Sequence, residues 1–236
     1  PDMKNIFVAI IVFASASLFA QNFNQYAPLQ CVGKIPEEFL IPSSKKYKSE
    51  IQRAEKKKIK KQELKDRKRF ALESNFVIDD MLQSGLVLFG DPVSLYLNDV
   101  AAQIIAANPT FKRKVNVYAL RSKAVNAFAT DRGTIFVTLG LLAQLENEAQ
   151  LAYILAHELV HIQEGHAMDL YLEAKDISRN ASRRSVYKKA SFDEQLLSKN
   201  RYSRKLETEA DNKGLDYYLL TKYSTDEISS VFDVLQ

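Results

Sequence analysis

The feature that most constrains the fold is His157-Glu158-Leu159-Val160-His161, which lies inside the apolar run 151–162. On a helix, residues four apart lie one turn apart, so His157 and His161 project from one face. Two such imidazoles can bind one Zn²⁺, and Glu158, about 100° around the helix, can reach water at that metal as a general base. Chance alone produces this pattern in roughly one chain in a hundred. All three histidines of the chain, however, fall within residues 157–166, which favours a metal site.

A second motif, Glu207-Thr-Glu209-Ala210-Asp211, offers a third metal ligand. Glu207 and Asp211 are four residues apart and share a helix face, whereas Glu209 points away by about 200° of helix rotation. In one class of zinc site, two histidines are joined by a glutamate, and Asp211 could then accept the free ring N–H of a ligating histidine. An acidic solvated face is the alternative. The upstream histidines and the small Ala210, which permits close helix approach, favour the metal-binding interpretation.

His166 is a competing third ligand, because it follows the other two histidines closely in the sequence. In metzincins the third histidine lies ten residues after the first, and a glycine seven residues after the first turns the chain. Here Gly165 is eight and His166 nine residues after His157, so both offsets differ. In a continuous helix His166 would lie about 140° from His161 and point off the metal, although a break at Gly165 could bring it back. We expect Glu207 to be the third ligand and keep His166 as the alternative.

The order of helix and strand signals is typical of an α+β domain. Asp91-Pro92 is an N-cap followed by proline at the first helical position, and apolar residues then recur at helical spacing until Asn108-Pro109. Asp131-Arg132-Gly133 predicts a hairpin loop, and Asn147 begins the helix that carries the histidines. We predict a mostly helical domain with a small, largely antiparallel sheet, with strands over 115–120, 125–130 and 134–139 and a last helix over 200–221.

Residues 1–20 predict a secretory signal peptide. Lys4 precedes an uncharged run that ends at Ala20 and is too short to cross a bilayer comfortably as a helix. We expect cleavage there and an exported protein in the periplasm, or on the periplasmic face of a bacterial envelope; an uncleaved anchor is the alternative. Cys31 is the only cysteine, which excludes an intramolecular disulfide framework.

Residues 21–75 are predicted to be an N-terminal extension whose centre, residues 45–69, is a basic arm. The arm holds thirteen Lys and Arg residues against four Asp and Glu, a net charge of +9 in a chain whose net charge is +4. A solvated helix or flexible arm is one interpretation, and a patch for anionic membrane or an acidic partner is the other. Nucleic acid is not an expected partner of an exported chain.

Five motifs follow one another along the chain: Asn126-Ala-Phe-Ala129, residues 133–142 (GTIFVTLGLL), residues 148–152 (EAQLA), the H-E-x-x-H with His166, and residues 203–211 (SRKLETEAD). Together they resemble the family-48 metallopeptidases, which include CAAX prenyl endopeptidases, HtpX-like heat-shock proteases, the mitochondrial Oma-type protease and soluble periplasmic relatives. The resemblance covers about residues 76–222. The single short apolar segment argues against the multi-spanning branches and leaves the Oma-like and periplasmic branch.

This resemblance implies a zincin-like peptidase domain over residues 76–236, acting on internal peptide bonds of misfolded or misassembled envelope proteins. It implies one Zn²⁺ per chain, with Glu158 as base, Asp211 as outer partner, and the ligands His157, His161 and Glu207. A polypeptide substrate would lie extended along the strand of Asn126, Ala127, Phe128 and Ala129. The alternatives are a catalytically silent zinc-binding assembly factor or chaperone, and an interaction module centred on the basic arm. The oligomeric state stays open, and the end at Gln236 leaves room for a missing C-terminal portion.

Overall fold

The computed structural model describes residues 35–41, 59–172, 175 and 204–234, together with positions 45, 48, 51, 52 and 55 of the basic arm. All of these belong to one compact unit, Cys31–Gln236, whereas the predicted signal peptide falls in the other unit, Pro1–Gln30, outside the described residues. Cys31 itself and residues 176–203 also lie outside them. None of the described helices combines the length and the apolar composition that crossing a bilayer requires.

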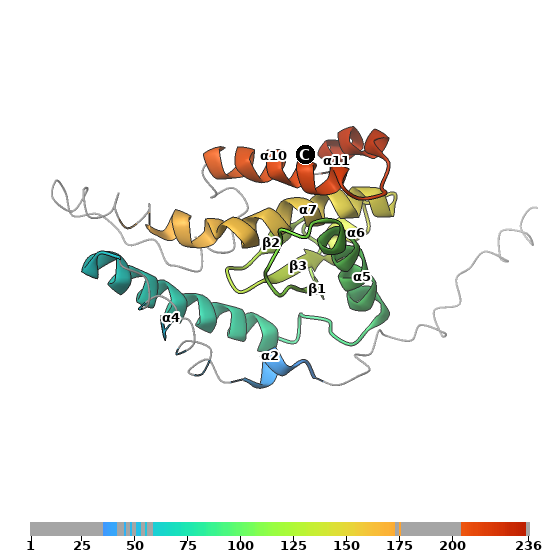
Figure 1. Ribbon diagram of the computed structural model, residues 1–236. Helices are drawn as coiled ribbons and strands as arrows, with labels where there is room; N and C mark the ends of the chain where they lie inside the picture. The colour runs from blue at the N-terminus through green and yellow to red at the C-terminus, as the bar shows by residue number, and fades with distance from the viewer. Residues whose placement is uncertain are drawn as a thin grey trace, which may run out of the picture. The chain divides into compact units, whose positions relative to one another are not determined.

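Helices dominate the described chain and surround one small sheet (Figure 1). This confirms the predicted α+β class. In chain order the elements are α2 (Glu37–Leu40), α4 (Lys61–Gln83), α5 (Pro92–Ala107), β1 (Asn116–Leu120), β2 (Ala127–Ala129), β3 (Thr134–Thr138), α6 (Leu139–Leu142), α7 (Glu148–Glu164), α10 (Arg204–Leu219), the 3-10 turn η4 (Thr225–Glu227) and α11 (Ile228–Val234).

The two predicted helix starts are confirmed by their caps. The Asp91 carboxylate accepts hydrogen bonds from the backbone N–H groups of Val93 and Ser94, at 2.9 and 3.0 Å. The Asn147 side chain accepts one from the backbone N–H of Gln150 at 3.0 Å. Each cap satisfies N–H groups that the first turn of a helix leaves without an intrahelical partner. Local sequence therefore sets where α5 and α7 begin.

The sheet has the strand order β1-β3-β2. β2 and β3 form the predicted hairpin, antiparallel, with Phe128 opposite Phe136 and Gly133 in the loop at φ 87°. β1 pairs with β3 in parallel, so the sheet is mixed, and the antiparallel expectation holds for the hairpin alone. β3, the central strand, is buried along its whole length, because its side chains pack into the core on one face of the sheet and against α4 on the other.

The chain after β1 reaches the far side of β3 by passing the end of that strand. The backbone carbonyl of Ser122 accepts a hydrogen bond from the backbone N–H of Gly140 at 2.9 Å. The Thr138 hydroxyl donates to the backbone carbonyl of Ala124 at 2.6 Å. A Cβ on Gly140 would lie 2.2 Å from the carbonyl oxygen of Lys123. Glycine at this position therefore makes room for the crossing that places β1 and β2 on opposite sides of β3.

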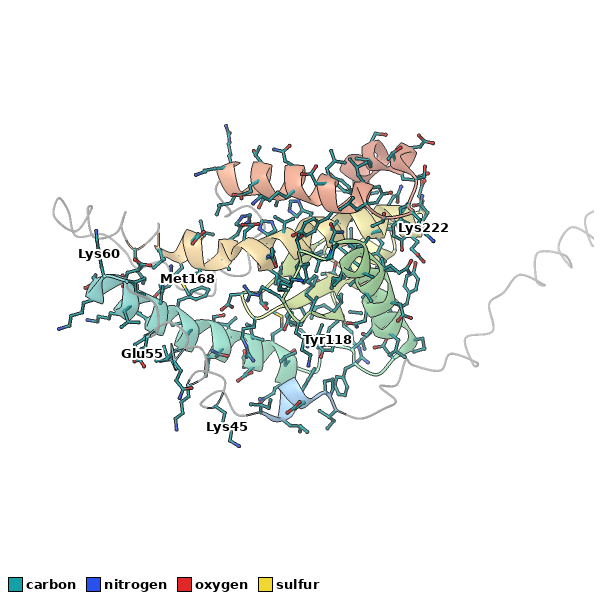
Figure 2. The ribbon with its side chains drawn as sticks, in the orientation of Figure 1. Lys45, Glu55, Lys60, Tyr118, Met168 and Lys222 are labelled. Atoms are coloured by element: carbon teal, nitrogen blue, oxygen red, sulfur yellow. The ribbon has the colours of Figure 1, made fainter. Side chains whose placement is uncertain are left out.

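Alternate residues of the strands pack on opposite faces of the sheet, as the two-residue period of a strand requires. One face joins the apolar core built with α5 and α7, through Val117, Ala119, Ile135 and Val137. The other face packs against α4, where Tyr118 and Phe136 join Ile78 and Leu82 (Figure 2 labels Tyr118). The sheet is thus a thin layer between α4 on one face and α5 with α7, the helix that carries His157 and His161, on the other.

Helix α4 runs through the predicted boundary at residue 75 without a break. Upstream of that residue, Phe70 is fully buried and its ring lies 5.1 Å from the ring of Tyr171. The Ser74 hydroxyl donates a hydrogen bond to Asp131, in the hairpin loop, at 2.5 Å. The end of the basic arm and the start of the predicted peptidase domain therefore share one helix that packs on the sheet.

Candidate active site

The predicted metal ligands, the predicted base and Asp211 come from two helices that lie side by side, α7 and α10 (Figure 1). α7 carries the histidines, and α10 carries the acidic motif. A Cβ on Gly214 would lie 3.0 Å from the Cα of His157, and Ala210 is fully buried. Both small residues let the helices approach closely. The sequence interpretation anticipated this for Ala210 and missed Gly214.

Three potential ligand atoms converge between the two helices. The Nε2 atoms of His157 and His161 are 3.0 Å apart. The Glu207 carboxylate lies 3.5 Å from the first of these atoms and 3.9 Å from the second. Ligand atoms of these three residues all lie within 4.8 Å of one another, so they can hold one metal ion. His166 does not belong to this group.

The other nitrogen of each ring faces outward to a partner. The Nδ1 atom of His157 lies 3.0 Å from the Asp211 carboxylate. The Nδ1 atom of His161 lies 2.8 Å from Nδ1 of His166. A proton that is held on the outer nitrogen leaves the lone pair of Nε2 directed at the metal. Asp211 and His166 therefore orient the two rings so that Nε2 of each ring can bind the metal, although neither residue is itself in the ligand group.

The two ligand histidines have opposite charge tendencies. Burial lowers the pKa of His157, but hydrogen bonds to Asp211 and Glu207 and the nearby charge of Glu158 outweigh it and raise the pKa to about 10. Burial, with the neighbouring histidines, lowers the pKa of His161 to about 2. Without a metal, the His157 ring is therefore a charged imidazolium at neutral pH, whereas the His161 ring is neutral and keeps a single N–H. Glu158 is itself buried, at 5% exposure.

His166 and Glu209 lie outside the group of converging ligand atoms, but they lie next to each other, which the sequence analysis did not foresee. α7 ends at Glu164, and Gly165 takes a left-handed conformation with φ 79°, so the helix does not continue into His166. The break brings His166 to the outer side of the His161 ring, with 1% of its surface exposed. Glu209, expected to point away, lies 3.6 Å from Nε2 of His166. The glycine after the helix was the available signal for this turn.

The predicted substrate strand is β2, which covers Ala127 to Ala129. It lies at the edge of the sheet and contacts α7, the helix that carries the histidines. Asn126 precedes it and donates its backbone N–H to the Thr138 hydroxyl at 3.1 Å. An extended edge strand thus lies next to the helix of the candidate ligands.

Gly214→Ala should damage the site although alanine favours helix by about 1 kcal/mol. The added methyl group would press on the backbone of His157, and overpacking of this kind costs about 1–3 kcal/mol. We expect α10 to move outward and the affinity for metal to fall by roughly tenfold or more, together with a lower melting temperature. Asn212→Ala, on the exposed side of α10, is the matched control and should change neither. Equal metal titrations for both variants would contradict the role of Gly214.

Two histidines and Glu207 form a donor set that is typical of metallopeptidases. The buried Glu158, between the two histidines in the sequence, is the residue that acts as the general base in such enzymes. The sequence model of peptidase family M48 matches residues 94–233. The chain belongs to this family.

Individual relatives are similar over parts of their length. The chain is 31% identical over 129 residues to the mitochondrial metalloendopeptidase OMA1 of Schizosaccharomyces pombe. The aligned region covers 52% of this chain and 38% of that protein. It is 28% identical over 87 residues to the putative beta-barrel assembly-enhancing protease of Vibrio cholerae, covering 36% of this chain and 18% of the relative. It is 25% identical over 92 residues to the beta-barrel assembly-enhancing protease of Yersinia pestis, an alignment that covers 39% of this chain and 19% of the relative. The chain thus spans less than two fifths of the length of these relatives.

Proposed function

We propose that the chain is a zinc-dependent endopeptidase that hydrolyses internal peptide bonds. The observation that carries the proposal is the orientation of the two ligand rings. Their Nε2 atoms face Glu207, while Nδ1 of each ring faces an outer partner. Rings that served only to pack the two helices would have no need of this arrangement. Membership of peptidase family M48 supports the same conclusion.

The separations of the ligand atoms fit zinc. Tetrahedral zinc with bonds of about 2.0–2.2 Å places its ligand atoms roughly 3.3–3.6 Å apart. The two Nε2 atoms are 3.0 Å apart, Oε2 of Glu207 lies 3.5 Å from Nε2 of His157 and Oε1 of Glu207 lies 3.9 Å from Nε2 of His161, all around that range. Two imidazole nitrogens and one carboxylate oxygen are a donor set of catalytic zinc sites, in which a fourth position stays open. We infer one Zn²⁺ per chain, held by His157, His161 and Glu207.

With zinc bound, the buried Glu158 and the outer partner Asp211 would have different roles. Bound zinc would polarise the scissile carbonyl and make water more acidic. Glu158 would accept the proton of the attacking water and give it to the leaving amine. Asp211 would accept the Nδ1–H of His157 and so keep the Nε2 lone pair directed inward.

A substrate would lie extended along β2. Thr130 donates its backbone N–H to the carbonyl of Thr134 at 2.8 Å, and Asn126 accepts from the backbone N–H of Thr138 at 3.0 Å. Because such pairs alternate along an antiparallel ladder, the backbone of Phe128 faces β3, and the backbone of Ala127 and Ala129 faces away from β3, at the outer edge of the described sheet. We therefore narrow the predicted strand of Asn126 to Ala129 to these two alanines as the backbone partners of a substrate.

The direct test is metal analysis combined with digestion of casein by the purified chain. We expect about one zinc per chain, cleavage that a chelator abolishes, and recovery when zinc is restored. Zinc binding without cleavage would favour a catalytically silent assembly factor or chaperone. Cleavage that persists after complete removal of metal would rule out the proposed mechanism.

Zinc binding should become tighter as the pH rises from 6 to 8. With a pKa of about 10, His157 is protonated over this whole interval, so zinc must displace one proton. Displacement of one proton raises the apparent affinity by about tenfold per pH unit. Titration calorimetry in buffers with different ionisation enthalpies should count close to one proton released. Asp211→Asn removes an acceptor that raises this pKa, so it should flatten the slope; an unchanged slope would mean that another group releases the proton.

We further propose that the protein is exported and cleaves misfolded or misassembled envelope proteins. The names of the two bacterial relatives, which describe proteases that enhance beta-barrel assembly, support this setting. Residues 1–20 would supply the export signal. The test is to fractionate cells that produce the whole chain and to identify proteins that accumulate when Glu158 is replaced by Gln.

The exposed face of α4 would make peripheral contact with an anionic membrane. Lys65, Arg69, Leu72 and Phe76 follow one another at helical spacing on this face, and the two apolar residues are 54% and 70% exposed. Arg67, Lys68 and Arg69 are each paired with a glutamate, so we assign the attraction on this face mainly to Lys65. Cationic residues beside exposed apolar residues are typical of helices that lie in a lipid interface.

Vesicle sedimentation tests this contact. The chain should bind vesicles that contain phosphatidylglycerol, release them at high salt, and ignore vesicles of phosphatidylcholine alone. Replacing Leu72 and Phe76 with serine should weaken binding, while Leu95→Ser, an exposed leucine of α5, should not. Equal binding by all variants, or preference for an acidic protein over lipid, would contradict a membrane role.

A further inference from the structure

The buried His166 has no part in the mechanism above, yet its ring closely contacts a proposed zinc ligand. Its Nδ1 atom lies 2.8 Å from Nδ1 of His161, and the two rings meet edge to face with centroids 4.8 Å apart. Nε2 of His166 is buried and has no hydrogen-bond partner within the part of the chain that the structure describes. The nearest acidic atom to it is an Oε2 of Glu209, at 3.6 Å.

The positions of the protons follow from this contact. Two Nδ1 atoms at hydrogen-bond distance need one proton between them. If His161 binds metal through Nε2, its remaining proton is on Nδ1, so His161 donates and His166 accepts. The proton of a neutral His166 must then be on Nε2, which faces Glu209. Glu209 is held in turn by Lys213 at 2.6 Å.

The geometry points to His166 as a positioning residue that fixes the tautomer and the orientation of His161 by accepting its Nδ1–H. We call this arrangement the relay: one hydrogen bond from His161 to His166, with the Glu209 carboxylate 3.6 Å from the far nitrogen of His166 as a nearby negative charge. This inference rests on the proposed zinc site. The two ligand histidines are thereby held in different ways. His157 meets a carboxylate directly, at Asp211, which is half exposed, whereas His161 meets a second imidazole inside the protein. Because Nδ1 of His166 faces the outer nitrogen of His161, His166 is an outer partner of the site and not its third ligand.

The alternative is that His166 only packs in the core. Two substitutions distinguish this packing role from the positioning role. His166→Phe keeps a ring of similar size but offers no acceptor. His166→Asn offers a side-chain oxygen close to the position of Nδ1. Each variant is examined as the full chain, by competition with a chelator for zinc, by the visible spectrum of the Co²⁺-substituted protein, and by the melting temperature of the metal-free protein.

The relay predicts that His166→Phe weakens zinc binding by about 10- to 100-fold and shifts the Co²⁺ spectrum, while His166→Asn restores most of both. Glu209→Gln, at the other end, should give a smaller change in the same direction. A loss of melting temperature in both His166 variants, with affinity and spectrum as in the wild type, would overturn the relay and leave the proposed function intact. Equal losses of affinity without rescue by asparagine would also overturn it. A wild-type chain that binds no zinc would instead overturn the proposed function and the relay with it.

Discussion

Replacement of Glu158 by Gln should leave the fold and the bound zinc in place and lower the rate of peptide hydrolysis by about 10⁴-fold, the upper end of the range for general acid–base catalysis. Glutamine has nearly the same shape but cannot accept a proton from water. Because Glu158 is buried at 5% exposure, a shape-preserving change is needed to keep the packing of α7. Glu158 is not one of the three converging ligands, so its replacement by a side chain of the same shape should leave the zinc bound.

Glu146→Gln is the matched control, since it makes the same chemical change at an exposed position just before α7. It should have wild-type activity. The measurements are zinc content, melting temperature and turnover of a peptide substrate by protein free of wild-type contamination. If Glu158→Gln had a turnover close to that of the control, Glu158 would not be the general base and the proposed mechanism would be wrong.

Much of the fold could be predicted because its signals are local. The cap at Asp91, the cap at Asn147 and the glycine of the 131–133 loop each act within a few residues, and each lies where the pattern placed it. The candidate ligands were accessible for a similar reason. Spacing of four residues on a helix aligns His157 with His161 whatever the rest of the chain does.

What the sequence interpretation missed depends on contacts between distant segments. The parallel pairing of β1 with β3 requires the chain to pass Gly140, and nothing near β1 signals that passage. Gly214 has an ordinary helical conformation, so its role is visible only when His157 lies against it. Helix spacing predicts the direction of Glu209 only relative to other residues of α10, such as Glu207. The chain turn at Gly165 then brought His166 to the side of α10 on which Glu209 lies.

Glu207→Ala should abolish zinc binding at micromolar metal, with a loss of affinity of roughly 10³-fold or more. Glu207 supplies the only oxygen among the three converging ligands, and it comes from a different helix. Without it, two imidazoles 3.0 Å apart would hold zinc from one side only. Loss of a direct ligand should exceed the roughly 10- to 100-fold effect of an outer partner. Zinc content by mass spectrometry and affinity by competition with a chelator give the measurement.

The comparison with His166→Ala decides which residue completes the site. His166 presents its Nδ1 to the outer nitrogen of His161, so truncation should weaken zinc binding without removing zinc from the purified protein. Glu207 faces the inner nitrogens of both histidines, so its truncation should leave protein that holds almost none. Thr208→Ala, at an exposed position of the same helix, controls for changes to α10 and should retain zinc. If instead His166→Ala lost its zinc and Glu207→Ala kept it, the third ligand would be His166, and the site would belong to a different class of zinc peptidase. The convergence of Glu207 with two Nε2 atoms within 4.8 Å is the reason to expect the opposite.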